Sequence, residues 1–492
     1  MPTLHALSNE TLDQIARTAS VPTYDRSRLS PGIVHIGLGN FHRAHQAWYL
    51  HRLMQQGLAL DWAIIGAGVR PNDEVQRQKL AAQDYLTTLV LLDPNTTSAE
   101  VTGSMIGYVP VEDGNGALVA AMAKPNIRIV AMTVTEGGYF LDPADGGFDA
   151  ENPDVRHDVQ NPSRPRTAFG AIIAALAKRR VEGHGPVSLM SCDNLQGNGT
   201  ILRQTVVSLA RLTDADLADW INENCSFPNS MVDCIVPATG PREVAHANEF
   251  GIDDKVPVTH EAFRQWVIED DFCAGRPEWN RVGATFSDRV HSYEAMKLRI
   301  LNGGHQIVAN AGELLSVGTI AECMTHPLIG DYFRKVAIEE IVPYVDAVPD
   351  VTPEEYLSLI DKRFSNPKIV DTTRRVAFDG SARHTGFLHP TLRDALKGTG
   401  SVSGLALAEA LWARMCAGSR EDGSEIEPND PIWDDLKLTA LAARHAPVTW
   451  LEQSQLYSDL STETRFADRF CHWLSTIWAD GTESVLRAYL AR

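Results

Sequence analysis

Residues 32–45 constrain the fold more than any other part of the chain. They read Gly-Ile-Val-His-Ile-Gly-Leu-Gly-Asn-Phe-His-Arg-Ala-His, and a helical pattern follows over residues 46–56. A short β-rich run, a G-x-G turn and a helix in this order are typical of a dinucleotide-binding unit. Gly37 permits the tight turn, Gly39 lets the backbone approach a pyrophosphate, and the helix offers N–H groups to that anion.

The third glycine of the usual fingerprint is absent, and His42 stands in its place. The helix and strand therefore pack less closely, and a glycine-rich turn at the start of another kind of α/β domain is the alternative. On the dinucleotide interpretation, the candidate cofactor-binding residues of this turn are Gly37, Leu38, Gly39, Asn40, Phe41, His42 and Arg43.

The choice between NAD and NADP depends on the end of the second predicted strand, residues 62–69. An acidic side chain there binds the adenosine ribose, whereas an arginine favours a 2′-phosphate. Both Asp73 and Arg70 follow this strand. We expect NAD rather than NADP because no further cluster of positive charge follows. Alternatively, Asp73 serves only as the N-terminal charge of a helix over residues 73–80.

Further strands are predicted at residues 85–92, 127–135 and 187–190, with a helix at 167–180 among them. This alternation predicts a largely parallel, doubly wound sheet. Polar clusters follow two of the strands and place Glu136 and Asn194 on the cofactor side. A simple Asp-Asn turn is the alternative for Asn194.

The second half of the chain changes character. A helix is predicted at residues 262–269, and strand signals fade from about residue 292. Helical patterns follow at residues 331–341, 353–364, 404–415, 434–443 and 466–478, with a loop at 417–431. We therefore predict an α/β fold in which a Rossmann-like domain, residues 1–290, precedes a mainly α-helical substrate and catalytic domain, residues 291–492.

Charge and cysteine content restrict the partners and the compartment. The 44 basic and 63 acidic residues give a formal net charge of −19, which argues against nucleic acid or an anionic membrane as partner. The seven cysteines are scattered and form no C-x-x-C pair, which suits a reducing compartment without disulfides or structural zinc. No signal peptide or membrane-spanning run is visible. We expect a cytoplasmic protein that acts on a small molecule.

Residues 293–305 form the strongest catalytic candidate. A helix there would place Glu294, Lys297, Asn302 and His305 on one face, although Gly303 and Gly304 would loosen or kink it. Without a cysteine-rich lobe or a helical H-E-x-x-H motif, a metal-free mechanism is favoured, in which Lys297 is the base of an alcohol oxidation. Asn194 and Asn302 would then donate hydrogen bonds to the developing oxyanion. The alternative is an ordinary amphipathic helix with solvated polar groups.

Five separated motifs occur in an order that resembles the polyol-specific long-chain dehydrogenases, the mannitol dehydrogenase family. They are G-L-G-N-F-H-R-A-H-Q at residues 37–46, T-V-T-E-G-G-Y at 133–139, S-C-D-N at 191–194, F-P through P at 227–237, and M-K through L-N-G-G-H at 296–305. The resemblance extends from about residue 28 to at least residue 395.

This resemblance implies metal-independent catalysis by a monomer, with a role for each matching position. Lys297 resembles the general base, Asn194 and Asn302 the oxyanion donors, His305 a residue that positions substrate and lysine, and Glu294 a proton shuttle. Asp233 and Arg375 resemble contacts to the distal hydroxyls of the substrate. Arg383 is a further substrate-binding candidate, for which a surface arginine is the alternative.

Two positions depart from the family pattern where the substrate is chosen. Cys234 replaces the arginine of a V-D-R motif, and Gly304 replaces the serine of a G-S-H motif. We expect NAD-dependent interconversion of a linear polyol such as D-mannitol with its 2-ketose. A D-mannonate/D-fructuronate pair is the main rival, D-arabinitol or D-sorbitol are other possible polyols, and a non-catalytic dinucleotide sensor is a remote alternative.

Overall fold

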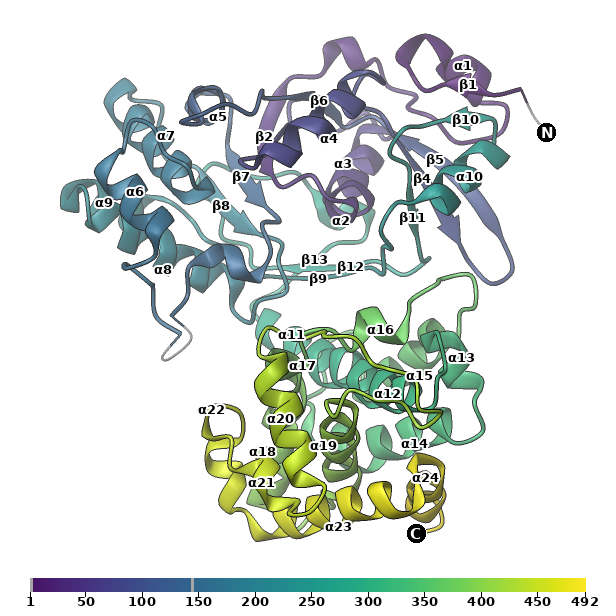
Figure 1. The fold of residues 1–492 in the computed structure, drawn as a ribbon. Coiled ribbons are helices and arrows are strands. Elements are labelled where there is room, and N and C mark those ends of the chain that lie inside the picture. Colours follow the sequence, from purple (N-terminus) through teal and green to yellow (C-terminus); the bar gives the residue numbers. More distant parts are fainter. Residues whose placement is uncertain (1–2, 143–145) are drawn as a thin grey trace. The chain divides into compact units, whose positions relative to one another are not determined.

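The computed structural model describes residues 3–142 and 146–492. The chain divides into two compact units, Met1–His291 and Ser292–Arg492. The first is built around a parallel sheet and the second is helical (Figure 1), which confirms the predicted fold class. No helix in the described ranges has both the length and the apolarity that crossing a membrane requires.

The first unit contains a five-stranded parallel sheet. Its strand order is β6-β3-β2-β7-β8. The strands are β2 (Pro31–Ile36), β3 (Ala63–Ala67), β6 (Met105–Tyr108), β7 (Ile129–Met132) and β8 (Ser188–Ser191). The chain passes from β2 outward to β6 and then resumes beside β2 with β7 and β8. The sheet is therefore doubly wound, and the strand order reverses between β2 and β7.

Both faces of this sheet are buried, because alternate side chains of each strand enter different cores. Val34 and Ile36 belong to the core formed with α5 (Gly116–Met122), α7 (Ala168–Glu182), α8 (Asn198–Arg211) and α9 (Ala215–Asn224). Ile33 belongs to the other core, with α3 (Gln46–Met54) and the side chains of Trp266 and Trp279. Further α-helices of the unit are α1 (Leu12–Ile15), α2 (Asn40–Ala44), α4 (Pro71–Ala81), α6 (Pro153–Gln160) and α10 (Pro241–Glu249).

The predicted strand at residues 85–92 does form, but it lies outside the parallel sheet. Strand β4 (Thr87–Leu92) pairs antiparallel with β5 (Thr97–Thr102) and parallel with β11 (Val258–His260). The short connection at residues 93–96 returns the chain directly alongside β4, and such a hairpin makes an antiparallel pair. A two-stranded sheet joins β1 (His5–Ala6) to β10 (Ile252–Asp253).

The predicted helix at residues 262–269 is wrong. The segment forms β12 (Gln265–Ile268), which pairs antiparallel with β9 (Ser230–Asp233) and parallel with β13 (Thr285–Phe286). Trp266, Val267 and Ile268 are fully buried. Aromatic and β-branched side chains of this kind suit a packed strand, and pairing with β9 over a long sequence separation outweighs the local helical pattern.

The second unit is helical, and α19 (Ser403–Met415) is almost completely buried within it. It packs against α12 (Gly303–Leu314) and α23 (Thr464–Asp480). The other main helices are α13 (Ile320–Thr325), α14 (Ile329–Val336), α15 (Pro353–Phe364), α16 (Thr373–Val376), α17 (Gly380–Arg383), α18 (His389–Lys397), α20 (Trp433–Ala443), α21 (Val448–Leu451), α22 (Ser454–Tyr457) and α24 (Thr482–Leu490). The five helices predicted after residue 330 are confirmed, although the first becomes a π-helix, η6, at Ala337–Ile341.

Candidate active site

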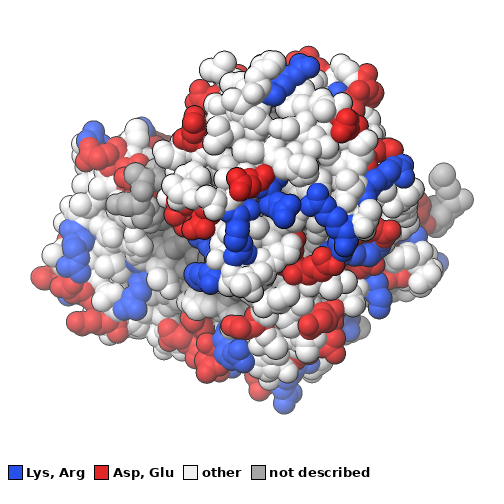
Figure 2. Space-filling model, turned by 90° about the horizontal axis from the view of Figure 1, so that it is seen from below, with Lys and Arg blue, Asp and Glu red and all other residues white. Residues whose placement is uncertain are grey.

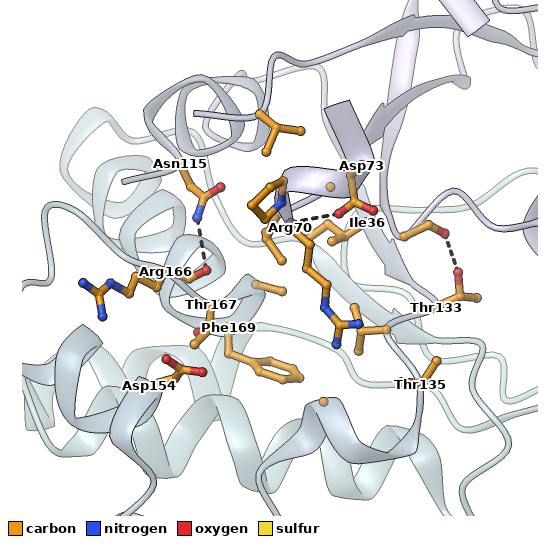
Figure 3. A pocket seen from close by; sticks show the side chains of 18 of the residues that line it. Ile36, Arg70, Asp73, Asn115, Thr133, Thr135, Asp154, Arg166, Thr167 and Phe169 are labelled. Atoms are coloured by element: carbon orange, nitrogen blue, oxygen red, sulfur yellow. Dashed lines mark hydrogen bonds between the residues drawn. The ribbon is translucent and has the colours of Figure 1, made fainter. Parts of the chain in front are cut away.

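A cavity of about 1010 Å³ lies in the first unit at the carboxyl ends of β2, β3 and β7 (Figure 3). Gly37 follows β2, Gly68 to Asp73 follow β3, and Thr133 to Thr135 follow β7. Ligands of doubly wound sheets bind where the strand order reverses, and this cavity occupies that place.

The two glycines of the first turn have different surroundings. Gly37 has φ +91°, and a Cβ there would stand 2.1 Å from the carbonyl oxygen of Thr133, so only glycine fits. Thr133 Oγ1 donates a hydrogen bond of 2.5 Å to the carbonyl of Gly37. A Cβ on Gly39 would meet nothing within 4 Å. The turn thus combines a close strand contact with open space beside Gly39, which fits the approach of a dinucleotide.

Arg70 and Asp73 both line the cavity, and Figure 3 shows the Arg70 side chain extending into it. Asp73 Oδ2 accepts a hydrogen bond of 2.9 Å from the backbone N–H of Arg70 at the start of α4. A Cβ on Gly68 would stand 2.3 Å from Cβ of Asp73, so the missing side chain of Gly68 makes room for this carboxylate. The Asp73 carboxylate therefore accepts a backbone hydrogen bond at the N-terminus of α4 and also faces the cavity.

Asn40 and Arg43 hold the turn rather than line the cavity. Asn40 Nδ2 donates hydrogen bonds of 2.8 Å to the carbonyl of Pro237 and to Thr239 Oγ1. The buried Arg43 guanidinium donates to Asn40 Oδ1 at 2.6 Å and to the carbonyl of Val256. These bonds attach the glycine turn to the segment that follows β9.

The other residues of the motif are packing residues in this structure, and none of them lines the cavity. Leu38 is buried against Gly66, where a Cβ would meet its Cδ1. Phe41 stacks on His45 with a centroid distance of 4.7 Å. His42 stacks on His35 at 3.5 Å, and burial lowers its pKa well below the usual value, with a further contribution from His35. Of the predicted cofactor residues, Gly37 and Asp73 are thus the ones that border the cavity; the side chain of Glu136 lies outside what the structure describes.

Sequence reasoning missed Asp193, which joins the segments after β7 and β8. Its carboxylate accepts hydrogen bonds from the N–H groups of Val134 at 3.1 Å and Thr135 at 3.0 Å, and from the hydroxyl of Tyr139 at 2.7 Å. The adjacent Asn194 is exposed. The signal was present, since a carboxylate directly after a buried strand needs donors, but the donors lie far away in the sequence.

The opposite wall of the cavity was also missed. It includes Asn115, Thr167 and Phe169. Asn115 Nδ2 donates a hydrogen bond of 2.9 Å to the carbonyl of Pro165. No motif marks these positions in the sequence, because their place in the cavity results from how α5 and α7 pack.

Asp233 ends strand β9 and is 5% exposed. Cys234, which follows it, is also buried. Asn198 fixes the start of the strand, since its Nδ2 donates to the carbonyls of Asp193 at 3.1 Å and Ser230 at 2.7 Å. One amide therefore ties the segment that carries Asn194 to the strand that carries Asp233.

In the helical unit, Lys297 begins a π-helical segment, η5 (Lys297–Asn302). This segment follows α11 (Val290–Met296) and continues without a break into α12. Lys297 and Glu294 are each 6% exposed. Residues 293–305 are thus helical, as predicted, and the irregular turn is the π-helical segment Lys297–Asn302, which ends directly before the glycine pair. Single π turns of this kind occur frequently at functional sites.

The glycine pair is explained by packing. A Cβ on Gly304 would stand 2.6 Å from Cε2 of Phe333, and one on Gly303 would stand 3.1 Å from Cδ2 of Leu388. Both glycines therefore admit neighbouring side chains to the surface of α12. Gly303 has ordinary right-handed helical dihedrals, with φ −62° and ψ −44°, and α12 begins at this residue.

His305 lies on α12 and stacks on Phe364, with ring centroids 4.2 Å apart and planes 14° apart. Neither His305 Nε2 nor Asn302 Oδ1 has a hydrogen-bond partner among the described residues, and both atoms are buried. Burial lowers the pKa of His305 to about 4. The imidazole is accordingly neutral near pH 7, with a nitrogen and an amide oxygen left for a ligand.

Arg375 and Arg383 lie close enough to His305 for their charges to lower its pKa further, against the opposing effect of Asp371. Arg375 forms two bonds with Asp371, of 2.7 and 2.6 Å, and its side chain remains exposed. Arg383 donates to the carbonyl of Val376 at 2.6 Å. The structure thus brings His305 and both predicted substrate-binding arginines together. No group of three or more His, Cys, Asp or Glu side chains in the described residues is arranged to hold a metal ion.

Comparison with known proteins identifies the family. The model of the mannitol dehydrogenase Rossmann domain matches residues 31–281, and that of the mannitol dehydrogenase C-terminal domain matches residues 289–478. The chain belongs to the mannitol dehydrogenase family. The resemblance stated from the sequence is confirmed, and the protein is an oxidoreductase of the class that acts on CH–OH groups.

Known proteins similar to this one cover almost the whole chain. A mannitol 2-dehydrogenase of Cereibacter sphaeroides is 52% identical over 97% of this chain and 100% of its own. A mannitol 2-dehydrogenase from Aspergillus oryzae is 37% identical over 98% of this chain and 99% of its own. Among solved structures, the ternary complex of Pseudomonas fluorescens mannitol 2-dehydrogenase with NAD and D-mannitol is 37% identical and has a TM-score of 0.91. The match covers 99% of this chain and 100% of the Pseudomonas chain. A substrate-free D-sorbitol dehydrogenase is 31% identical and has a TM-score of 0.88. The match covers 98% of this chain and 100% of the D-sorbitol dehydrogenase chain.

Proposed function

We propose that this protein oxidises D-mannitol to D-fructose with NAD and catalyses the reverse reduction. The observation that carries the proposal is the likeness over almost the full chain, 52% identity, to a mannitol 2-dehydrogenase. The similar Pseudomonas fluorescens structure with NAD and D-mannitol supports both the cofactor and the substrate. The open space beside Gly39 and the cavity at the sheet's switch point fit the dinucleotide.

In the proposed mechanism NAD, when bound, accepts a hydride from the alcohol carbon. Lys297, which is buried, removes the hydroxyl proton through Nζ as the general base. Asn194 and Asn302 donate hydrogen bonds to the oxygen that becomes the carbonyl. Glu294, equally buried and three positions before Lys297 along α11, passes the proton onward to solvent.

Substrate recognition is assigned to four further residues. His305 stays neutral and orients the reacting hydroxyl and the lysine, while Asp233, Arg375 and Arg383 bind the distal hydroxyls. Arg375 already binds Asp371 through Nε and Nη2. Its remaining guanidinium donors are the ones we assign to the polyol. No metal ion takes part in this mechanism.

The first test is turnover by the purified protein, followed as NADH absorbance, with D-fructose, D-fructuronate and D-xylulose supplied separately. NADPH runs in parallel, because Arg70 stands in the cavity beside Asp73. We expect D-fructose with NADH to be the preferred pair. Preference for D-fructuronate would contradict the polyol assignment and make Arg375 and Arg383 a carboxylate site.

The base is tested by Lys297→Ala. Loss of a positioned general base costs about 10²–10⁴-fold in turnover, so kcat should fall by that factor while NADH still binds. Lys397→Ala is the matched control, because this exposed lysine pairs with Asp394 on the surface of the same unit. A Lys297→Ala variant with unchanged kcat would refute the role of the lysine. A wild-type protein that binds NADH but reduces none of the ketoses would favour a dinucleotide sensor.

D-sorbitol is the second candidate polyol, on the likeness to a D-sorbitol dehydrogenase over 98% of this chain. D-Sorbitol and D-mannitol differ in configuration at one carbon, so their relative kcat/KM in the oxidation direction separates the two proposals. D-Arabinitol is tested in the same series. We further propose a cytoplasmic location, which cell fractionation would test.

A further inference from the structure

A second cavity, of about 450 Å³, lies in the helical unit and is lined by four cationic side chains. Lys335 comes from α14, Arg465 and Arg469 from α23, and Arg492 from the segment after α24. Glu339 is the one acidic residue among its described lining residues. Figure 2 shows Lys and Arg side chains gathered in a band on the face seen from below, the side on which α23 and α24 lie in Figure 1.

The wall formed by residues 400–403 is held in place by hydrogen bonds. The Arg465 guanidinium donates to the carbonyls of Gly398 and Gly400. Trp473 Nε1 donates to the carbonyl of Ser403 at 2.9 Å. The buried carboxylate of Glu340 accepts from Ser401 Oγ at 2.6 Å and from the first N–H groups of α19. These N–H groups are therefore already hydrogen-bonded to Glu340 and are not available to a ligand. An anion in the cavity would be attracted by the cationic side chains that line it.

Within the described residues, three of the four cations lack an acidic partner, and Arg465 is one of them because it donates only to backbone carbonyls. Within the described residues, the Arg469 and Arg492 side chains form no ion pair and no hydrogen bond; Arg492 stands over the Trp473 ring at 4.6 Å. Elsewhere in the unit Arg393 pairs with Asp459 and Arg487 with Glu483. The arginines outnumber the one acidic lining residue, and an anion between them would relieve their mutual repulsion.

The Ser403 hydroxyl adds a neutral donor. It belongs to the lining residues, and its oxygen is buried without a hydrogen-bond partner. Lys335 is partly neutralised, because its Nζ lies 2.7 Å from Glu339 Oε1. The donors that remain are two planar guanidinium groups and one hydroxyl, the combination that binds tetrahedral oxyanions through paired N–H groups.

We propose that this cavity binds a small dianion of the phosphate class, either inorganic phosphate or a phosphate monoester, through Arg469, Arg492 and Ser403. A doubly charged ligand matches two guanidinium groups better than a monocarboxylate does. The volume of about 450 Å³ also admits the carbon skeleton of a small ester. None of these residues belongs to the proposed catalytic set, so the site goes beyond the dehydrogenase activity.

The test is calorimetric titration of the full-length protein with inorganic phosphate and, separately, with glycerol 3-phosphate at low ionic strength. Saturating NADH is present, so that neither probe binds in the dinucleotide cavity. We expect saturable binding of at least one probe to a single site. In the variant Arg469→Gln/Arg492→Gln the affinity should fall by about tenfold or more, because two charge-assisted contacts are lost.

Arg487→Gln is the matched control, since this arginine lies on α24, pairs with Glu483 and does not line the cavity. It should leave the affinity unchanged, and both variants should retain ketose reduction, which verifies their fold. Tighter binding of one probe assigns the natural ligand to the free ion or to the ester. Absence of saturable binding to the wild-type protein, or equal affinity in the double variant, would overturn the proposal.

Discussion

At the scale of single residues, burial determines the charge of His305. In the unfolded chain a histidine has a pKa of about 6.5, whereas burial lowers the folded value for His305 to about 4. Between these values the unfolded chain binds a proton that the folded protein does not bind. Lower pH in this range therefore favours unfolding, and the stability that the neutral His305 contributes is fully present only above about pH 6.5.

We expect His305→Gln to weaken this pH dependence. The variant should lose less free energy of unfolding than the wild-type protein between about pH 7.5 and pH 5, because one group with a lowered pKa is gone. Urea unfolding at the two pH values measures the difference. Replacement of the exposed His445 by Gln serves as control. Equal pH dependence in His305→Gln and the wild type would show that the pKa of His305 in the folded protein does not differ from its pKa in the unfolded chain.

Asp193 is the residue whose importance is visible only in the structure. Asp193→Ala would leave the N–H groups of Val134 and Thr135 without their acceptor, whereas the Tyr139 hydroxyl would keep its hydrogen bond of 2.6 Å with Ser191 Oγ. Val134 is half-buried and Thr135 is exposed, so water can replace the lost acceptor in part, and we expect a loss of about 0.5–1.5 kcal/mol in stability together with a lower NADH affinity. Fluorescence titration with NADH measures the second effect, because Val134 and Thr135 border the dinucleotide cavity.

The control for Asp193 is the exposed Asp219, which pairs with Arg211 on the surface of the same unit. Asp219→Ala should leave both properties unchanged. If Asp193→Ala bound NADH as tightly as the wild type, the segment at residues 133–139 would hold its conformation without this carboxylate.

At the scale of elements, the helix that carries the proposed catalytic residues depends on its neighbours. Segment η5 packs against the two other π-helical segments of the unit, η6 and η8 (His384–Leu388). A π turn is a costly local geometry, and these packing contacts support it. The sequence predicted a helix here, but it carries no signal for a π turn, which the contacts with distant segments decide.

Gly304 offers a direct test of this packing. In Gly304→Ser the new Cβ would collide with Phe333, which we expect to cost about 1–3 kcal/mol of stability, the usual range for overpacking. Phe333→Leu in the same chain should restore much of the loss by making room. Thermal unfolding measures stability, and KM for the ketose reports whether His305 has moved. Unchanged stability of Gly304→Ser would mean that Phe333 turns aside freely.

At the scale of the whole molecule, the formal net charge of −19 opposes self-association. We expect a monomer. Light scattering coupled to size-exclusion chromatography should give a mass near 54.0 kDa at moderate ionic strength. Twice that mass, independent of protein concentration, would contradict this prediction and would point to a stable dimer.

Features that depend on local order along the chain could be predicted from the sequence. The G-x-G turn after an apolar strand, the alternation of strands and helices, and the change to helical periodicity after residue 292 are all confirmed, because each follows from residue spacing and glycine geometry. Tertiary structure decided the rest. Strand β12 replaces a predicted helix, β4 joins another sheet, and Asn40 and Arg43 fix the turn. These outcomes depend on partners far apart in the sequence, whose contacts outweigh local propensity.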